Sequence, residues 1–381
     1  MADFRERIGR ARARMDELGI SLLYLSPGAN AYYLTGWRRR PPTYGNIVRN
    51  GGWVEGLLIG LSGEPTLVVP RMIKDFWLKQ DLSLAVRVLP DLAEPIEFLR
   101  DTFETFNPGT GAIAIDDRAS AELVLGIQQA RPGVKTVVAS GVLSEMRMRK
   151  SEEELDLMSR AGKIVERAMD DILGYLRPGT GQTELDVCWE IDRLMVQHGA
   201  FWPSFTTNVW QMGPSEDRPL AEKASPRRLE YGNALLFDFG SVLDEYCYDF
   251  GRTVFLGEPT DEYLRIHDLV VESQRVGIEA LRAGKWTAEQ VDAMARAVIA
   301  EGGYGDYFTH RLGHGIGLDV HEPPFLDAGD ERYVEEGMCF TVEPSIFMPG
   351  RLGSRIEDVV VVTAKGGEPL TNYDRGPRVV N

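Results

Sequence analysis

Apolar residues in the first 140 positions follow two different spacings. At the N-terminus they recur every three or four positions, at Phe4, Ile8, Ala11, Met15 and Leu18. This spacing predicts an amphipathic surface helix. Further on, short apolar runs bounded by turn-forming or polar residues predict strands at 21–26, 54–61, 65–70, 111–117 and 135–140. Because helical patterns such as 93–106 lie between these runs, we expect an α/β domain with a mixed sheet.

The pattern changes near residue 147. Residues 145–173 carry a long amphipathic stripe, and Ser151 followed by Glu154 forms a capping-box motif that predicts a helix start. Further helices are predicted from Thr183 onwards and over 261–282. Apolar strand patterns follow at 233–240, 245–256, 337–347 and 354–363. We therefore expect two domains, with boundaries 1–147 and 148–381, which agrees with a chain of 381 residues.

The helices and strands of the second domain fall into two similar clusters. The first cluster covers residues 151–256 and the second covers residues 261–363. Each contains helical patterns followed by apolar strand patterns. This repetition indicates an internal duplication, although residue-level similarity between the clusters is slight.

The composition is that of an ordinary globular protein. Apolar residues make up 43% of the chain and charged residues 26%, which excludes a disordered or collagen-like protein. The formal net charge is −16, and an acidic surface repels phosphate backbones. No apolar run approaches the roughly 20 residues that cross a bilayer. We expect a soluble protein with neither a nucleic-acid nor a membrane partner.

The number and spacing of the cysteines indicate the redox environment in which the protein works. The three cysteines, Cys188, Cys247 and Cys339, are widely spaced and form no CxxC pair. Their odd number and spacing predict neither a disulfide framework nor a zinc–thiolate site, and favour a reducing environment. The N-terminus lacks the apolar segment of a secretory signal. We expect a cytoplasmic protein.

Four carboxylates interrupt strand patterns that are otherwise apolar: Asp238 in LLFDFG, Asp249 in YCYDFGRTVF, Glu343 in CFTVEP and Glu357 in SRIEDVVVV. An isolated ionised carboxylate costs several kcal/mol to bury, so each needs a partner or a metal ion. The nearby candidate partners are Arg252 and Arg355. Two arginines cannot easily neutralise four carboxylates, whereas two divalent ions carry +4 against −4. The charge balance favours a dinuclear metal site.

A segment rich in histidine and glycine completes the candidate site. Three of the five histidines, His310, His314 and His321, lie in HRLGHGIGLDVHEPP. Glycine at every second position from 313 to 317 predicts an extended backbone that another group approaches closely. On a strand, His310 and His314 would face the same side. HEPP differs from HExxH, which excludes a zinc-protease motif carried on a helix.

Together these residues resemble a known family. Asp238, Asp249, His314, Glu343 and Glu357 match, in order and local context, the five metal ligands of metallopeptidases with the pita-bread fold. SPGANAYYLTGW (26–37) is similar to the N-terminal signature of the branch that contains prolidase, aminopeptidase P and creatinase. Methionine aminopeptidases lack this domain, and creatinase lacks the metal ligands. The resemblance implies an α+β protein, with an N-terminal creatinase-type α/β domain before a pita-bread catalytic domain.

The resemblance also implies how two divalent metal ions are held. Asp249 and Glu357 bridge the two ions, Asp238 chelates one of them, and His314 with Glu343 holds the other. Two ions that share a hydroxide lower its pKa and clamp the tetrahedral intermediate. Four carboxylates and one imidazole suit manganese, with iron, cobalt or zinc as alternatives.

The neighbouring residues receive roles by the same resemblance. Glu343 also carries the proton of the attacking water. His321 contacts the scissile carbonyl and stabilises its developing negative charge, while His310 lines the substrate pocket. Arg355, two residues from Glu357, shares a strand face with it and orients the carboxylates or binds the substrate.

The sequence departs from the family in one place. The peptidases carry a further histidine upstream of the first aspartate ligand, which binds the substrate near the leaving group. Residues 213–233 contain no histidine, and Ala221 occupies the corresponding position with Asp217 and Arg218 nearby. This departure leaves the metal chemistry intact but removes one contact to a peptide substrate.

Three functions are compatible with these residues. The first is a metallopeptidase of the Xaa-Pro dipeptidase or aminopeptidase type, which cleaves the bond before proline in a small peptide. The second is a C–N hydrolase or lyase that acts on a small amide or metabolite at the same site. The third is a binding protein without activity, which the intact ligand set disfavours. The family commonly forms homodimers through the N-terminal domain, so a homodimer is expected by resemblance.

Overall fold

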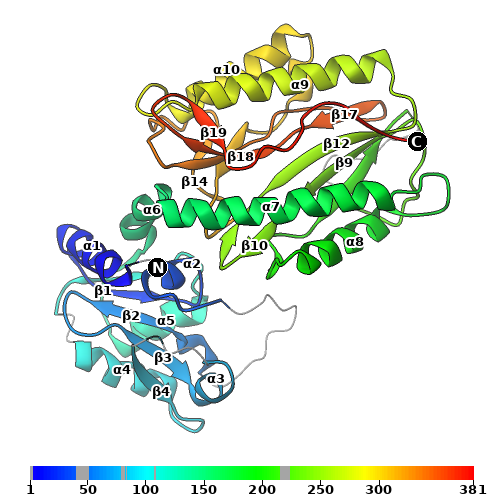
Figure 1. Ribbon diagram of the computed structural model, residues 1–381. Helices are drawn as coiled ribbons and strands as arrows, with labels where there is room; N and C mark the ends of the chain where they lie inside the picture. Colours follow the sequence, from blue (N-terminus) through cyan, green and yellow to red (C-terminus); the bar gives the residue numbers. More distant parts are fainter. Residues whose placement is uncertain (1–2, 40–50, 79–81, 83, 107–108, 215–223) are drawn as a thin grey trace. The chain divides into compact units, whose positions relative to one another are not determined.

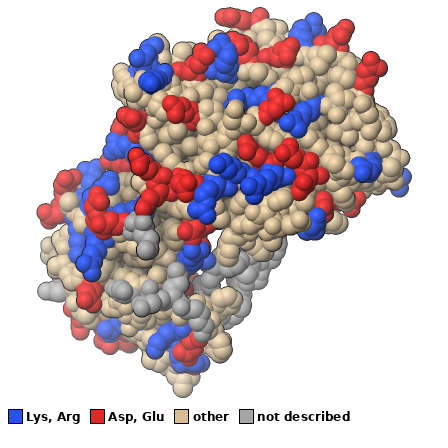
Figure 2. All heavy atoms as spheres, viewed as in Figure 1, with Lys and Arg blue, Asp and Glu red and all other residues tan. Residues whose placement is uncertain are grey.

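The computed structural model describes residues 3–39, 51–78, 82, 84–106, 109–214 and 224–381. The chain divides into two compact units, Met1–Arg147 and Met148–Asn381 (Figure 1). Among the described residues, no helix combines the length and the apolar character that a bilayer span requires. On the face shown in Figure 2, acidic and basic side chains lie among one another and do not gather by sign.

The first unit is built on a six-stranded mixed sheet of order β4-β3-β2-β1-β5-β6. Strand β2 runs antiparallel to both of its neighbours, and the other pairs are parallel. The strands are β1 (Ile20–Leu25), β2 (Gly56–Gly60), β3 (Thr66–Pro70), β4 (Ala85–Leu89), β5 (Ala112–Ile115) and β6 (Thr136–Val138). The helices are α1 (Phe4–Glu17), α2 (Ala29–Thr35), α3 (Arg71–Phe76), α4 (Pro95–Phe106), α5 (Ala121–Ala130) and α6 (Ser140–Met148).

This sheet confirms the predicted mixed α/β domain. Apolar side chains of α4 and α5, among them Leu99 and Ile127, pack with Leu22 and Leu58 of the sheet in one core. The sequence pattern missed strand β4. It lies at the edge of the sheet and is mostly half-buried, with Val86 exposed and the charged Arg87 at its centre, so its apolar pattern is weak.

The second unit places its strands between two helix pairs (Figure 1). One pair is α7 (Glu152–Tyr175) with α8 (Glu184–Gln197), and the other is α9 (Asp261–Ala280) with α10 (Ala288–Glu301). Helix α7 begins at the predicted capping box, in which Ser151 and Glu154 bond each other's backbone. Helix α10 was not predicted. The two helix pairs, each followed by antiparallel strands, correspond to the two clusters recognised in the sequence.

The strands of the second unit form two main sheets and two smaller ones. The first sheet has the order β20-β12-β9-β8, and the second has the order β14-β13-β15-β18-β19. Their strands are β8 (Asn208–Met212), β9 (Ala234–Phe239), β12 (Phe250–Leu256), β13 (Gly313–Gly315), β14 (Glu322–Leu326), β15 (Cys339–Val342), β18 (Asp358–Val362), β19 (Gly367–Pro369) and β20 (Arg378–Val380). The smaller sheets contain β7 (Trp202–Pro203), β10 (Ser241–Leu243), β11 (Tyr246–Cys247), β16 (Ser345–Met348) and β17 (Leu352–Arg355).

Three predicted strands are wrong as single elements, since each is two strands with a break. Residues 245–256 form β11 and β12, residues 337–347 form β15 and β16, and residues 354–363 form β17 and β18. A candidate ligand lies in every break, namely Asp249, Glu343 and Glu357. An apolar run does not reveal where the chain leaves one sheet for another, because residues on both sides of the break are buried.

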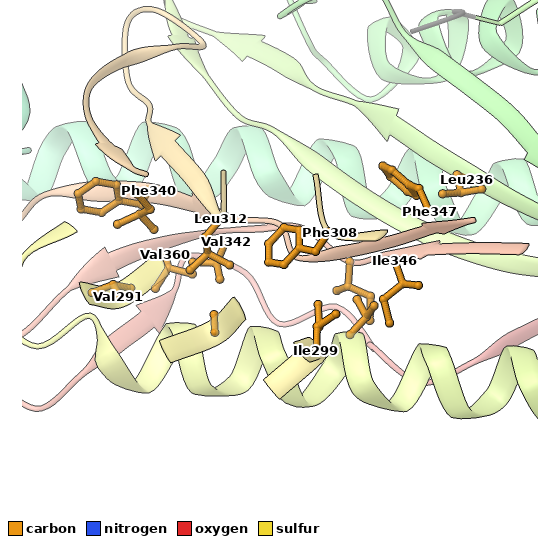
Figure 3. Packing of buried hydrophobic residues seen from close by; sticks show 14 of the residues in the cluster. Leu236, Val291, Ile299, Phe308, Leu312, Phe340, Val342, Ile346, Phe347 and Val360 are labelled. Atoms are coloured by element: carbon orange, nitrogen blue, oxygen red, sulfur yellow. The ribbon is translucent and has the colours of Figure 1, made fainter. Parts of the chain in front are cut away.

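A large apolar core lies beneath these strands (Figure 3). Val291 and Ile299 of α10 meet Phe340 of β15 and Val360 of β18 in one cluster of fully buried side chains. Burying an apolar side chain of this size stabilises a fold by about 1.5–3 kcal/mol. The core therefore gives the strand breaks above it a rigid base.

Candidate metal centre

The five predicted ligands line one cavity of about 1110 Å³ in the second unit. Asp238 lies near the end of β9 and His314 at the centre of β13, while the other three occupy the strand breaks. Nε2 of His314 lies 3.4 Å from Oε1 of Glu343 and 3.7 Å from Oδ2 of Asp249. Ligand atoms of Asp249, His314 and Glu357 all lie within 4.8 Å of one another. Five segments of the chain, two strands and three strand breaks, thus converge on one cavity.

A glycine at position 251 allows the backbone around Glu357 to pack closely against strands β9 and β12. Gly251 pairs with Asp238 across β12 and β9, and forms an isolated bridge with Glu357. A Cβ atom on Gly251 would lie 3.0 Å from both Cβ and Oε2 of Glu357, closer than side chains normally pack. Position 251 therefore requires a residue without a side chain, because only then can Glu357 lie beside Asp238.

The glycines around His314 confirm the expected close approach, and the approaching group is backbone. A Cβ on Gly313 would lie 1.9 Å from the carbonyl oxygen of Thr341, and one on Gly315 would lie 2.3 Å from that of Glu322. These contacts let β13 fit between its neighbours β14 and β15.

The prediction that His310 and His314 share a strand face is wrong. Strand β13 covers only Gly313–Gly315, so His310 lies before it, although both imidazoles line the cavity. Side chains of α10 help to hold the backbone between these two histidines. Arg296 donates to the carbonyls of Phe308 and His310, and Asp292 accepts the N–H of Leu312.

Sequence reasoning missed Asp292 and Arg296. Both line the cavity, and Arg296 forms a two-pronged ion pair with the Asp292 carboxylate. The only local signal is their i, i+4 spacing on a helix. That spacing is equally common on solvent-exposed helices, so it did not point to a site.

One of the two arginines expected as carboxylate partners belongs to the site and the other does not. Nη2 of Arg355 lies 2.8 Å from Oδ2 of Asp238 and 3.4 Å from Oε2 of Glu357, and its Nη1 lies 3.8 Å from Oε2 of Glu343. Arg252 instead pairs with Asp358, at 2.7 Å. Within the described residues, the Arg355 guanidinium therefore forms ion pairs with three of the four carboxylates.

The donor set fits divalent metal ions. Oδ1 of Asp249 and Oε2 of Glu357 are buried and have no hydrogen-bond partner among the described residues. Buried oxygens of this kind are rare in proteins, and each needs an explanation. Carboxylate oxygens with one imidazole nitrogen are the ligands of first-row divalent metals. The residues that could hold the ions are Asp238, Asp249, His314, Glu343 and Glu357.

The carboxylates of the site raise one another's pKa values. Burial raises the pKa of Asp249 well above its ordinary value, and repulsion from Asp238 and Glu343 adds to this. Burial also raises the pKa of Glu357, together with repulsion from Asp249 and Glu343. The pKa of Glu343 rises to about 7 through burial, although the Arg355 charge opposes the rise. Such a cluster holds protons when no cation is bound.

His314 is poised to act as a neutral ligand. Burial, assisted by the nearby His321, lowers the pKa of His314 to about 3. Its Nδ1 lies 3.1 Å from the carbonyl oxygen of Gly315, which can only accept a hydrogen bond. The proton therefore resides on Nδ1, and the lone pair of Nε2 faces Asp249 and Glu343. In metal-binding histidines generally, a hydrogen bond from the other ring nitrogen, like the one from Nδ1 here, fixes the orientation of the imidazole.

The other two histidines of the cavity differ in whether their ring nitrogens are already engaged in hydrogen bonds. The His321 ring is centred 4.1 Å from that of His314, lines the cavity and has a pKa lowered by burial. His310 donates from Nδ1 to the carbonyl of Arg311 and accepts at Nε2 from Oγ of Ser345, 2.5 Å away. Burial lowers the pKa of His310 to about 4. His321 can contact a substrate directly, whereas both His310 nitrogens are occupied.

Ala221, Asp217 and Arg218, which stand where the family carries its upstream histidine, lie outside the described residues. The described cavity wall near Asp238 is formed by Asn208, which pairs with Asp238 across β8 and β9. Oδ1 of Asn208 accepts the N–H of Ala224. A polar amide therefore lies beside this ligand.

The fold and the cavity define a two-domain metallopeptidase. A model of metallopeptidase family M24 matches residues 156–364, and a model of the creatinase/prolidase N-terminal domain matches residues 7–149. The chain belongs to metallopeptidase family M24. This membership confirms the fold class and the family inferred from the five ligands.

Relatives and solved structures agree over the whole length. An Xaa-Pro dipeptidase of Pyrococcus furiosus is 31% identical and covers 97% of this chain and 99% of its own. A probable dipeptidase, PepE, of Mycobacterium tuberculosis is 34% identical over 97% of this chain and 94% of its own. The crystal structure of prolidase from Thermococcus sibiricus superposes with a TM-score of 0.89, at 30% identity and with 100% of both chains covered.

Proposed function

We propose that this protein is a dinuclear-metal Xaa-Pro dipeptidase, which hydrolyses the bond before proline in small peptides. The observation that carries the proposal is the convergence of four carboxylates and a neutral imidazole on one cavity, with two buried oxygens that lack a hydrogen-bond partner among the described residues. The names of the P. furiosus and T. sibiricus relatives support the choice of substrate. The alternative C–N hydrolase or lyase is not favoured by any relative named above.

Asp238, Asp249, His314, Glu343 and Glu357 would together hold the two ions. Two divalent ions supply an activated water nucleophile at neutral pH and polarise the scissile carbonyl. The guanidinium of Arg355, against Asp238 and Glu357, keeps these carboxylates aimed into the cavity. Arg355 is therefore a positioning residue in this scheme.

The remaining side chains transfer the proton of the attacking water and stabilise the negative charge that develops on the substrate. Glu343 accepts the proton of the attacking water and returns it to the amine that leaves. His321, neutral and partly open to the cavity, donates a hydrogen bond to the carbonyl oxygen as its negative charge develops. His310, held by Ser345 and the Arg311 carbonyl, forms a fixed wall of the pocket.

Three finer proposals accompany this function. Manganese is the proposed metal, because four carboxylates and one imidazole form a mainly oxygen donor set. A cytoplasmic location is supported by Cys188, Cys247 and Cys339, which are all buried and free. A homodimer is proposed from the family resemblance, and light scattering of the purified chain would test it.

The function is tested with a panel of substrates under matched metal loading. We expect hydrolysis of Xaa-Pro dipeptides in the presence of Mn²⁺, loss of hydrolysis after chelation, and recovery when Mn²⁺ is restored. Dipeptides without proline and small amides are the controls. Turnover of small amides without turnover of any Xaa-Pro dipeptide, with either Mn²⁺ or Co²⁺, would refute the proposal.

A further inference from the structure

Two of the candidate ligands extend from the same end of one strand pair. Strands β15 and β18 pair as far as Val342 and Asp358. Glu343 directly follows Val342, Glu357 directly precedes Asp358, and both glutamates line the cavity. Successive residues of a strand project to opposite faces, so Asp358 points away from the cavity that Glu357 lines. Any group that fixes this end of the strand pair therefore also fixes the two ligands.

Asp358 is a fully buried carboxylate whose charge is balanced by two arginines. Its Oδ1 lies 2.7 Å from Nη2 of Arg252, and its Oδ2 lies 2.8 Å from Nε of Arg375. Arg252 also donates to the carbonyl oxygen of Glu357, at 2.8 Å. Asp358 is thus an anchor for the backbone next to Glu357, on the side of the strand away from the cavity.

Gln274 of α9 contacts both strands with one amide group. Its Nε2 donates to the carbonyl oxygen of Val342, 3.0 Å away, and to Oδ2 of Asp358, 3.1 Å away. A carbonyl and an ionised carboxylate only accept hydrogen bonds, so the amide nitrogen has to face them. The Gln274 side chain is fully buried. It joins the residue before Glu343 to the residue after Glu357.

The hydrogen bonds of Gln274 contribute little net stability to the fold. Oε1 of Gln274 is buried and has no hydrogen-bond partner in the described part of the chain. A hydrogen bond within a protein contributes modestly, whereas a buried polar atom without a partner carries its whole desolvation penalty. The two bonds from Nε2 are therefore largely offset by the unpaired oxygen. Because an apolar side chain of the same length would serve the fold about equally well, stability does not explain a glutamine here.

We propose that Gln274 is a positioning residue of the metal centre, which sets the separation between Glu343 and Glu357. This inference rests on the dinuclear site of the proposed function. Ligands are held in a productive geometry by the hydrogen bonds behind them, and loss of such a bond weakens metal binding. Without the Gln274 amide, the ends of β15 and β18 are no longer tied together through α9, so the two carboxylates are free to move apart.

The metal affinity of Gln274→Met tests the proposal. Methionine keeps the length of glutamine and removes both hydrogen bonds together with the unpaired oxygen. We expect calorimetric titration of the metal-free protein with Mn²⁺ to show an affinity about 10- to 100-fold weaker for at least one ion. Ser273→Ala is the matched control, because Ser273 is also fully buried on α9 and its Oγ donates to the carbonyl oxygen of Ala295 on α10. The control should bind Mn²⁺ as the wild type does.

Two further measurements separate positioning from a general structural role. Urea denaturation of the metal-free proteins should show that Gln274→Met loses no more stability than Ser273→Ala. The electron paramagnetic resonance spectrum of a Mn²⁺ pair depends on how the two ions are bridged. It should therefore change in Gln274→Met and stay unchanged in Ser273→Ala. Gln274→Asn, whose shorter amide does not reach both acceptors, is a second variant that should also bind Mn²⁺ more weakly.

The outcome for Gln274 is distinguishable from the outcome for the proposed function. Weaker Mn²⁺ binding by Gln274→Met and Gln274→Asn supports the inference even if no Xaa-Pro dipeptide is cleaved. Affinities and spectra equal to those of the wild type in both variants would overturn it, even if Xaa-Pro dipeptides are hydrolysed well.

Discussion

Nζ of Lys150 lies 2.7 Å from Oε1 of Glu322, and the two side chains are only 3% and 7% exposed. Lys150 precedes helix α7, and Glu322 directly follows His321. A Cβ on Gly317 would lie 2.6 Å from Oε1 of Glu322, so the ion pair packs against the loop between His314 and His321. The pair therefore joins the start of the catalytic unit to the loop that carries two site histidines.

Breaking this pair should destabilise the protein strongly. Glu322→Gln leaves the Lys150 ammonium buried without a counter-charge, which costs about 3–5 kcal/mol in the free energy of unfolding. Urea denaturation followed by circular dichroism measures the loss. The double variant Lys150→Met with Glu322→Leu should lose less stability than the single variants Lys150→Met and Glu322→Leu lose in total. A Glu322→Gln midpoint equal to that of the wild type would contradict the expectation.

Metal loading should stabilise the protein more at pH 8 than at pH 6. In the metal-free protein the pKa of Glu343 is about 7, and those of Asp249 and Glu357 are well above their ordinary values. A carboxyl whose folded pKa is raised stabilises the fold at low pH and loses that contribution as the pH rises through the folded pKa. Protons and metal ions also compete for the same oxygens.

Scanning fluorimetry with Mn²⁺ and with a chelator, at several pH values, tests this dependence. The difference in Tm between the two conditions should grow from pH 6 to pH 8. Calorimetry in buffers of different ionisation enthalpy should show proton release on binding. A constant Tm difference would show that the carboxylates are ionised throughout this range without metal.

His314→Ala and Glu343→Ala should each lose one metal ion and most of the activity. Both residues face the same side of the cavity, with their ligand atoms 3.4 Å apart. Elemental analysis of the purified variants counts the bound ions, and His198→Ala, at a histidine on α8's C-terminal end, is the control. Two ions per chain in both site variants would exclude these residues as ligands.

His321→Ala should behave differently from the ligand variants. Its ring neighbours that of His314. In the proposed mechanism, however, His321 contacts the substrate and holds no metal ion, so both ions should remain. Loss of one hydrogen-bond donor to a developing oxyanion lowers kcat by about 10²–10³-fold. Steady-state kinetics on Xaa-Pro dipeptides measures this loss. Normal kcat in His321→Ala would remove the residue from the mechanism.

Gly251→Ala should impair metal binding without touching a ligand. The added methyl group would lie 3.0 Å from Oε2 of Glu357 and 3.2 Å from Nε of Arg355, so at least one of these side chains has to move. We expect about a 10- to 100-fold weaker metal affinity, as for other changes behind a ligand. Gly141→Ala, where a methyl group meets open space, is the control. Equal affinities in the two variants would contradict the packing argument.

The local features of this protein were determined by sequence alone. The capping box at Ser151, the helix at the N-terminus and the strand of Asp238 depend on residues within a few positions of one another. The five candidate ligands could be named because carboxylates in apolar strands are costly, and because their order resembles that of a known family. Both kinds of information lie in residue type and spacing.

The partners of the charged groups were decided only by the tertiary structure. Arg252 and Arg355 were both candidate partners of the buried carboxylates in the sequence, yet Arg252 pairs with Asp358, 106 positions away, while Arg355 faces the metal centre. The strand breaks at the ligands likewise depend on distant elements, as does the hydrogen bond that Asp292 accepts from the Leu312 N–H, just before His314. Long-range packing fixes which groups are brought together in the interior, and low dielectric there makes each pairing decisive for charge. No local pattern contains that information.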